Sequence, residues 1–332
     1  MPVKSSSSVS SVRSVVASLI LQHALNLKAE MSTQTTRESR FLDPAVIARL
    51  GTLELKARTI VEGFLSGLHR SPFKGFSVEF AEYRQYIPGD DLSTIDWKVF
   101  ARSDRYYVKK FEEETNLDCH LMLDVSGSMG YGDHHAMTKF EYGACLAASL
   151  AYLMNRQRDA VGLTAFDENI VSMLPASSRP GHLRAVLVTL DRLKAAHQTD
   201  VSKPLHQLAE SLTKRGMVVL ISDLLDDPDA VIRGLKHFQF RGIDVIVFHI
   251  LDPDEIEFPF ERATRFEDLE TSEEILAVPG AVRDHYLKEM GGLIDRYKRE
   301  LGGTGIDYQL LSTKHPLELA LLSYLSTRSR AL

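Results

Sequence analysis

Residues 217–225 of the chain read MVVLISDLL, an unbroken apolar run that ends at a serine and an aspartate. A second run of this kind, VIVFHI, occupies residues 245–250. Strands with one face in water alternate apolar and polar residues, whereas strands covered on both faces are apolar throughout. The two runs therefore predict central strands of a sheet that carries helices on both sides.

Around these runs, apolar segments of strand length alternate with amphipathic segments of helix length. With these two runs included, the predicted strands cover residues 119–126, 160–167, 170–177, 217–225, 244–252 and 305–313. The predicted helices cover residues 139–159, 180–196, 202–216, 227–242 and 316–330. This alternation is typical of an α/β fold, and we expect an open, mostly parallel sheet with helices on both faces.

The rest of the chain divides into three parts. Residues 1–40 are serine-rich and basic, and we expect a disordered extension, or upstream sequence if translation starts at Met31 rather than Met1; a transit peptide or a weak signal peptide is the alternative. Residues 41–115 predict a small α+β segment, with a helix from Asp43 to Leu68 and short antiparallel strands. The main domain is expected over residues 116–332, with an acidic hairpin inserted near residues 255–280.

Composition limits the function. The formal net charge of -6 excludes a uniformly basic surface, so we expect no nucleic-acid partner. A continuous apolar run of about 20 residues, long enough for a membrane span, does not occur. Cys119 and Cys145 are expected to be buried thiols in a reducing compartment, and the expected location is the cytoplasm. His134 and His135 are expected to lie on a solvated loop.

The motif Asp124-Val125-Ser126-Gly127-Ser128 follows the first strand of the main domain. Alternate side chains of an extended segment point the same way, so Asp124, Ser126 and Ser128 can converge on one point. Asp223 follows a buried strand in the same relative position, and Thr199 lies in a loop that enters a helix. These five hard oxygen donors could surround Mg²⁺ or Mn²⁺. The alternative is that Asp124 and the serines only close a turn.

This pattern of five residues resembles the metal-ion-dependent adhesion site (MIDAS) of von Willebrand factor A-type domains, and the order of strands and helices is similar. The resemblance implies a binding module rather than an enzyme. It also implies that the two serines and Thr199 bind the ion directly, that the two aspartates bind it directly or through water, and that a carboxylate from a partner protein completes the coordination shell.

A second resemblance concerns the segment before the main domain. Its elements are Arg84-x-Tyr86, Gly89-Asp90-Asp91 and Ile95-Asp96-Trp97-Lys98, with Arg102. They resemble the signature of the bacterial domain-of-unknown-function family fifty-eight, which joins such a segment to an A-type domain. Its relatives are associated with MoxR-type AAA+ ATPases, so the resemblance implies such an ATPase as partner.

Two further expectations concern roles. Arg84, Asp90, Asp91 and Asp96 are candidate partner contacts, although the turn chemistry of Pro88-Gly89-Asp90-Asp91 favours turn and cap roles for Asp90 and Asp91. A Mg²⁺- or Mn²⁺-dependent hydrolase or phosphatase is the alternative function. The sequence contains no G-x-x-x-x-G-K-[ST] nucleotide-binding loop, no G-x-S-x-G nucleophile elbow and no H-E-x-x-H metalloprotease helix. This favours binding over turnover.

Overall fold

The structure is a computed structural model of the chain. It describes residues 43–70, 83–85, 107–109, 117–196, 201–212, 215–271 and 273–331. The expectations for residues 1–40, for the turn at Gly89-Asp90-Asp91 and for Asp96 lie outside the described residues.

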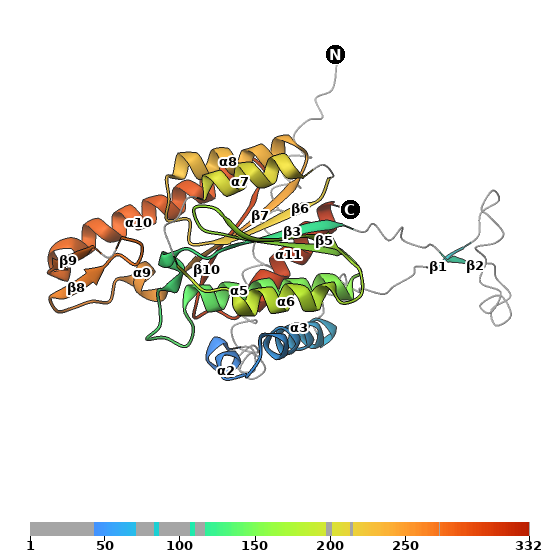
Figure 1. Ribbon diagram of the computed structural model, residues 1–332, viewed down its shortest axis with the longest axis horizontal. Helices are drawn as coiled ribbons and strands as arrows, with labels where there is room; N and C mark the ends of the chain where they lie inside the picture. The colour runs from blue at the N-terminus through green and yellow to red at the C-terminus, as the bar shows by residue number, and fades with distance from the viewer. Residues whose placement is uncertain are drawn as a thin grey trace, which may run out of the picture.

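The described part of the main domain contains a six-stranded sheet in the order β10-β7-β6-β3-β4-β5 (Figure 1). Its strands are β3 (Asp118–Asp124), β4 (Ala160–Phe166), β5 (Ile170–Ser177), β6 (Met217–Ser222), β7 (Asp244–Leu251) and β10 (Asp307–Ser312). All neighbouring pairs are parallel except β4 and the edge strand β5, which are antiparallel. The expected fold class, an open and mostly parallel α/β sheet, is confirmed.

Helices cover both faces of this sheet (Figure 1). On one side lie α3 (Leu53–Arg70), α5 (Lys139–Arg156), α6 (His182–Arg192) and α11 (Glu318–Ala331). On the other side lie α7 (Ser202–Ser211), α8 (Pro228–Phe240) and α10 (Pro279–Gly302). The two faces bury separate cores, and β6 serves both, since Val219 belongs to the first core and Val218 and Leu220 to the second. This is why MVVLIS is apolar throughout.

The predicted helix from Asp43 to Leu68 is two helices in the structure, so its continuity was wrong. Asp43 caps α2 (Pro44–Ala48) as its sequence position indicates, with its side chain accepting from Ala45 N. The chain then turns at Gly51, and the Thr52 hydroxyl accepts from Leu55 N at the start of α3. Ile60, Val61 and Phe64 of α3 are buried in the same core as α5.

Shorter elements complete the described chain. Strands β1 (Tyr83–Gln85) and β2 (Tyr107–Lys109) form an antiparallel pair. The 3-10 helix η3 (Gly127–Gly130) follows β3, and the short helix α9 (Pro253–Glu257) follows β7. Strands β8 (Thr264–Glu267) and β9 (Glu274–Ala277) form an antiparallel hairpin within the stretch where the sequence indicates one. Within the described residues, every helix is too short or too polar to cross a lipid bilayer.

Candidate functional site

The carboxyl ends of two neighbouring strands bring the candidate site together. Asp124 is the last residue of β3, and β6 ends at Ser222, directly before Asp223. The two strands pair in parallel register, with Leu123 beside Ile221. As a result, the Ser222 hydroxyl donates to Asp124 Oδ2 at 2.6 Å, and all three side chains are fully buried. Such edges of parallel sheets are where α/β folds bind ligands.

The two serines of the motif point to a common position. The backbone N–H of Ser126 donates to Asp124 Oδ1 at 2.9 Å, which fixes the turn after β3. The Ser126 and Ser128 hydroxyl oxygens then lie 3.1 Å apart. Ser128 belongs to η3, so this short helix returns its hydroxyl to the side on which Ser126 lies. The two hydroxyls therefore converge, as the sequence spacing predicts.

Asp124 occupies an environment that disfavours a lone negative charge. Burial, with the nearby charge of Asp223 as the second cause, raises the pKa of this carboxyl to about 7. Hydrogen bonds from Ser222 and Ser126 oppose the shift. Two buried carboxylates at close range repel each other, and a cation between them removes that cost. The site therefore has the electrostatic character of a cation site.

Asp223 already has one internal cation beside it. Lys139 Nζ lies 2.7 Å from Asp223 Oδ2 and 2.6 Å from Glu255 Oε1, and the lysine side chain is fully buried. Burial alone would lower the pKa of Lys139, but the two carboxylates outweigh it and raise that pKa. The remaining oxygen, Asp223 Oδ1, accepts from Leu225 N. The lysine thus faces two carboxylates, Asp223 and Glu255, whereas Asp124 lies close enough to Asp223 for its pKa to be affected by that charge.

Thr199 lies outside the described residues, but the chain on either side of it is held near the site. Ala196 N donates to Val125 O at 2.9 Å, directly beside the motif. Val201 N donates to Asp226 Oδ2 at 2.9 Å, three residues after Asp223. Of the five candidate ligands, the described residues therefore bring together Asp124, Ser126, Ser128 and Asp223.

The candidate partner contacts are placed only in part. The backbone of Arg84 pairs with Val108 in the β1–β2 ladder. Asp90, Asp91 and Asp96 lie outside the described residues.

The donor set fits a hard divalent cation. Mg²⁺ holds oxygen ligands at about 2.1 Å in octahedral geometry, so adjacent ligands are about 3 Å apart. The separation of 3.1 Å between the two serine hydroxyls matches that spacing. Carboxylate and hydroxyl oxygens are the donors that Mg²⁺ and Mn²⁺ prefer.

Three residues of the site were missed by reasoning from sequence. Ser222, Lys139 and Glu255 all contact the predicted aspartates or one another. A weak signal existed for two of them: Ser222 directly precedes Asp223, and Lys139 follows Thr138 in a Thr-x-x-Glu capping pattern. Glu255 carries no such signal toward the site.

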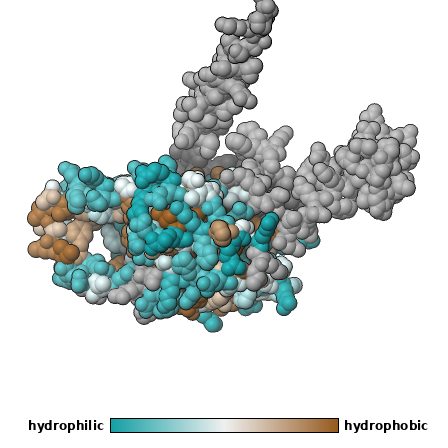
Figure 2. Space-filling view, turned by 90° about the horizontal axis from the view of Figure 1, so that it is seen from above, coloured by the Kyte–Doolittle hydropathy of each residue, from teal (hydrophilic) through white to brown (hydrophobic). Residues whose placement is uncertain are grey.

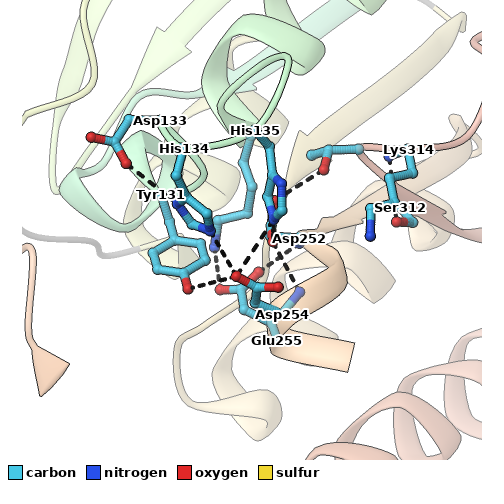
Figure 3. Close-up of polar contacts among 11 residues, drawn as sticks. Tyr131, Asp133, His134, His135, Asp252, Asp254, Glu255, Ser312 and Lys314 are labelled. Atoms are coloured by element: carbon cyan, nitrogen blue, oxygen red, sulfur yellow. Dashed lines mark hydrogen bonds and ion pairs between the residues drawn. The ribbon is translucent and has the colours of Figure 1, made fainter. Parts of the chain in front are cut away.

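The histidine pair lies on a loop with His134 exposed, as expected, but both rings contact carboxylates and His135 is partly buried. His134 Nε2 lies 2.7 Å from Asp254 Oδ2, and His135 Nε2 lies 3.3 Å from Asp252 Oδ1 (Figure 3). His135 keeps only 26% of its side chain exposed. These aspartates lie far along the chain, at the junction of β7 and α9, so no local sequence pattern indicates the contact.

Fold and site together define a class: an open α/β domain whose sheet ends in a buried cluster of carboxylates and hydroxyls. The model of the family described as "Protein of unknown function DUF58" matches residues 82–291, which is more than half of the chain. The protein belongs to this family.

Three comparisons illustrate the relatives. An uncharacterized protein of Mycobacterium tuberculosis is 26% identical over 292 residues, covering 87% of this chain and 91% of that protein. The conserved hypothetical protein BatB from Bacteroides thetaiotaomicron has 16% identity and a TM-score of 0.45, covering 65% of this chain and all of that one. The SpRpn10 VWA domain has 15% identity and a TM-score of 0.34, covering 65% of this chain and 96% of that one.

Proposed function

We propose that the protein is a non-enzymatic, metal-dependent protein-interaction module. In this proposal Asp124, Ser126, Ser128, Thr199 and Asp223 hold one Mg²⁺ or Mn²⁺ ion. An acidic side chain from a partner protein completes the coordination shell, and the first partner to test is a MoxR-type AAA+ ATPase. The proposed place of action is the bacterial cytoplasm.

The observation that carries the proposal is the position of Asp124. It is a fully buried carboxylate at the carboxyl end of the central strand β3, close to the hydroxyls of Ser126 and Ser222 and to a second buried carboxylate, Asp223. Burying an unbalanced carboxylate is costly unless a cation or a proton compensates it. A divalent cation would compensate both aspartates together.

The character of the ligands supports recruitment of a carboxylate. Three of the five proposed ligands are neutral hydroxyls, so a bound divalent ion keeps positive charge that an incoming aspartate or glutamate can share. Lys139 strengthens this effect, because it already neutralises part of the charge on Asp223. The lysine is held between two carboxylates, which leaves it poorly placed to act as a general base. Binding is therefore favoured over turnover.

The first test measures thermal unfolding of the full chain as Mg²⁺ is added. A ligand that binds only the folded state at one hundred times its Kd raises the free energy of unfolding by about 2.7 kcal/mol. We expect wild type to show such a rise and Asp124→Asn to lose it, because the substitution removes the charge while preserving the shape. Asp191→Asn is the matched control, since Asp191 is exposed on α6 and should keep the full response.

An equal Mg²⁺ response in Asp124→Asn and wild type would contradict the assigned site. A second test measures binding of the purified MoxR-type ATPase from the same genome, with Mg²⁺ and with EDTA. We expect binding in Mg²⁺, loss in EDTA and loss in Asp124→Asn. Chelator-independent binding would exclude the metal as the bridge, and Mg²⁺-dependent phosphate release by wild type but not by Asp124→Asn would favour the hydrolase alternative.

A further inference from the structure

A second cluster of metal-binding side chains lies beside the site described above. It consists of His134 and His135, from the loop between η3 and α5, and of Asp252 and Asp254, from the junction of β7 and α9 (Figure 3). One ligand atom each from His134, His135 and Asp254 lies within 4.8 Å of the others. The two halves of the cluster are 120 residues apart in sequence, so the fold itself assembles it.

Two of the distances match the spacing of ligands around a tetrahedral ion. Ligands at about 2.0–2.1 Å from a tetrahedral Zn²⁺ are about 3.3 Å from one another. His135 Nε2 lies 3.3 Å from Asp252 Oδ1 and 3.4 Å from Asp254 Oδ2. The contact between His134 Nε2 and Asp254 Oδ2 is shorter, at 2.7 Å, which is a hydrogen-bond distance. A small movement of one imidazole would open it.

His135 provides an independent indication of a binding site. Its Nε2 atom is buried and makes no hydrogen bond to any of the described residues, although two carboxylates face it. Buried polar atoms in folded proteins are nearly always satisfied by a hydrogen bond or an ion. A metal ion between His135 and the two aspartates would satisfy this nitrogen and both carboxylates.

The surrounding structure holds the ligands in place. Asp252 accepts from Asp254 N through Oδ1 and from the Thr313 hydroxyl through Oδ2, so its orientation is fixed. Gly132 has φ of 102°, and a side chain there would come within 2.9 Å of Asp252 Oδ2. The glycine thus allows the histidine loop to pack against Asp252. Such outer contacts are what orient the ligands of metal sites.

We propose that His134, His135, Asp252 and Asp254 form a binding site for a divalent transition metal, with Zn²⁺ as the ion that fits best. Imidazole nitrogen and carboxylate oxygen are ligands that Zn²⁺ prefers, whereas Mg²⁺ prefers oxygen alone. With four ligands from the protein, the site is structural, and it fastens the histidine loop to the start of α9. It shares no ligand with the proposed Mg²⁺ site and does not depend on it.

The test uses the untagged full chain, freed of metal, and Zn²⁺ in competition with a chromophoric chelator. We expect wild type to withdraw one equivalent of Zn²⁺ and the double variant His134→Ala/His135→Ala to bind it at least about 100-fold more weakly, since loss of outer contacts alone costs 10–100-fold. Asp254→Asn, which keeps the shape of the side chain, should also weaken binding. Co²⁺ added to wild type should give the intense visible absorption of a tetrahedral complex.

The matched control is His206→Ala/His237→Ala. These histidines also form a pair, with their Nδ1 atoms 3.3 Å apart, but on helices α7 and α8. We expect this variant, and Asp124→Asn, to bind Zn²⁺ as wild type does. The proposal is overturned if wild type withdraws no Zn²⁺ from the chelator, or if the His134/His135 and His206/His237 variants lose it equally. Circular dichroism of each variant shows whether a loss reflects unfolding instead, in which case Asp254→Asn decides.

Discussion

Lys139 carries a positive charge into the interior of the domain, between the carboxylates of Asp223 and Glu255. Its side chain is fully buried, so water contributes nothing to its solvation. Taking a charge out of water costs several kcal/mol, which only close partners can offset. Each member of this triad is therefore needed by the other two, and the triad links the candidate metal site to the start of α9.

Lys139→Met tests this dependence. The substitution keeps most of the side-chain volume but leaves Asp223 and Glu255 buried without their cation, so we expect a loss of about 3–5 kcal/mol in the free energy of unfolding. Urea unfolding in the absence of divalent ions measures it. Lys288→Met on the exposed face of α10 is the control and should change stability by less than about 0.5 kcal/mol. A similar small change for Lys139→Met would show that the triad adds little to the fold.

Burial also determines the reactivity that we expect for the two cysteine thiols. Cys119 and Cys145 are both buried, as the sequence indicated. Burial raises the pKa of the Cys145 thiol to about 11, and only the thiolate is nucleophilic. We expect neither thiol to react with Ellman's reagent at pH 8 in the native chain, and both to react in guanidinium chloride. Ser178→Cys, at an exposed position, should react at once; an equally fast reaction in wild type would mean that the core opens.

At the scale of elements, the helix starts differ in how well they are capped. Helix α5 begins with a complete capping box, in which Thr138 Oγ1 accepts from Glu141 N and Thr138 N donates to Glu141. Val278 is the N-cap of helix α10. Its extended backbone suits a cap, but its side chain makes no capping bond. A side chain therefore caps the first turn of α5, whereas the Val278 side chain does not cap the first turn of α10.

A pair of opposite substitutions tests the difference. Thr138→Ala should lower the free energy of unfolding by about 1 kcal/mol, because the backbone N–H of Glu141 loses its partner, the Thr138 hydroxyl. Val278→Ser should raise it by about 1 kcal/mol, since Val278 is 62% exposed and gives up little packing. Thermal and urea unfolding measure both. If Val278→Ser destabilises the chain, the exposed valine is packed against something after all.

For the whole molecule, the local pattern of apolar residues predicted the sheet, whereas the packing of the helices depends on contacts between segments that are distant in sequence. Residues 217–222 and 245–250 could be read as central strands because burial on both faces leaves a continuous apolar run. The docking of α3 on α5 could not be predicted, because an amphipathic helix shows which face is buried but not which surface covers it. The ends of β3 and β6 indicated Asp124 and Asp223, since strand ends of parallel sheets converge.

The contacts that the sequence did not reveal join distant segments. Lys139 and Glu255 are 116 residues apart, and His134 and Asp254 are 120 apart. Both pairs place a residue near the start of α5 against the start of α9. Neither segment has a periodicity that points at the other, so only the assembled fold brings them together. The proposed zinc site and the Lys139 triad are therefore results of topology rather than of motif.

One end of the molecule also carries an exposed apolar surface. The β8–β9 hairpin projects beyond α9, on the side where the parallel strands have their carboxyl ends (Figure 1). Figure 2 shows brown, hydrophobic atoms gathered at this end. Ile275 and Leu276 of β9 are 66% and 77% exposed. Phe266 pairs with Ile275 across the hairpin, and its ring lies 5.1 Å from that of Phe260. A partner that reached the candidate metal site would also meet this hairpin.

Leu276→Ser should therefore change the surface without changing the fold. Because the leucine side chain is already in water, its loss should alter the free energy of unfolding by less than about 0.5 kcal/mol, as for ordinary surface positions. Retention on a hydrophobic-interaction column should shorten, and the Mg²⁺-dependent rise in melting temperature should stay as in wild type. Glu274→Ser on the same strand is the control, because it removes no apolar surface and should not shorten retention. A loss of more than about 1 kcal/mol in Leu276→Ser would mean that the hairpin folds back onto the domain in solution, with its apolar face covered by this chain rather than free for another.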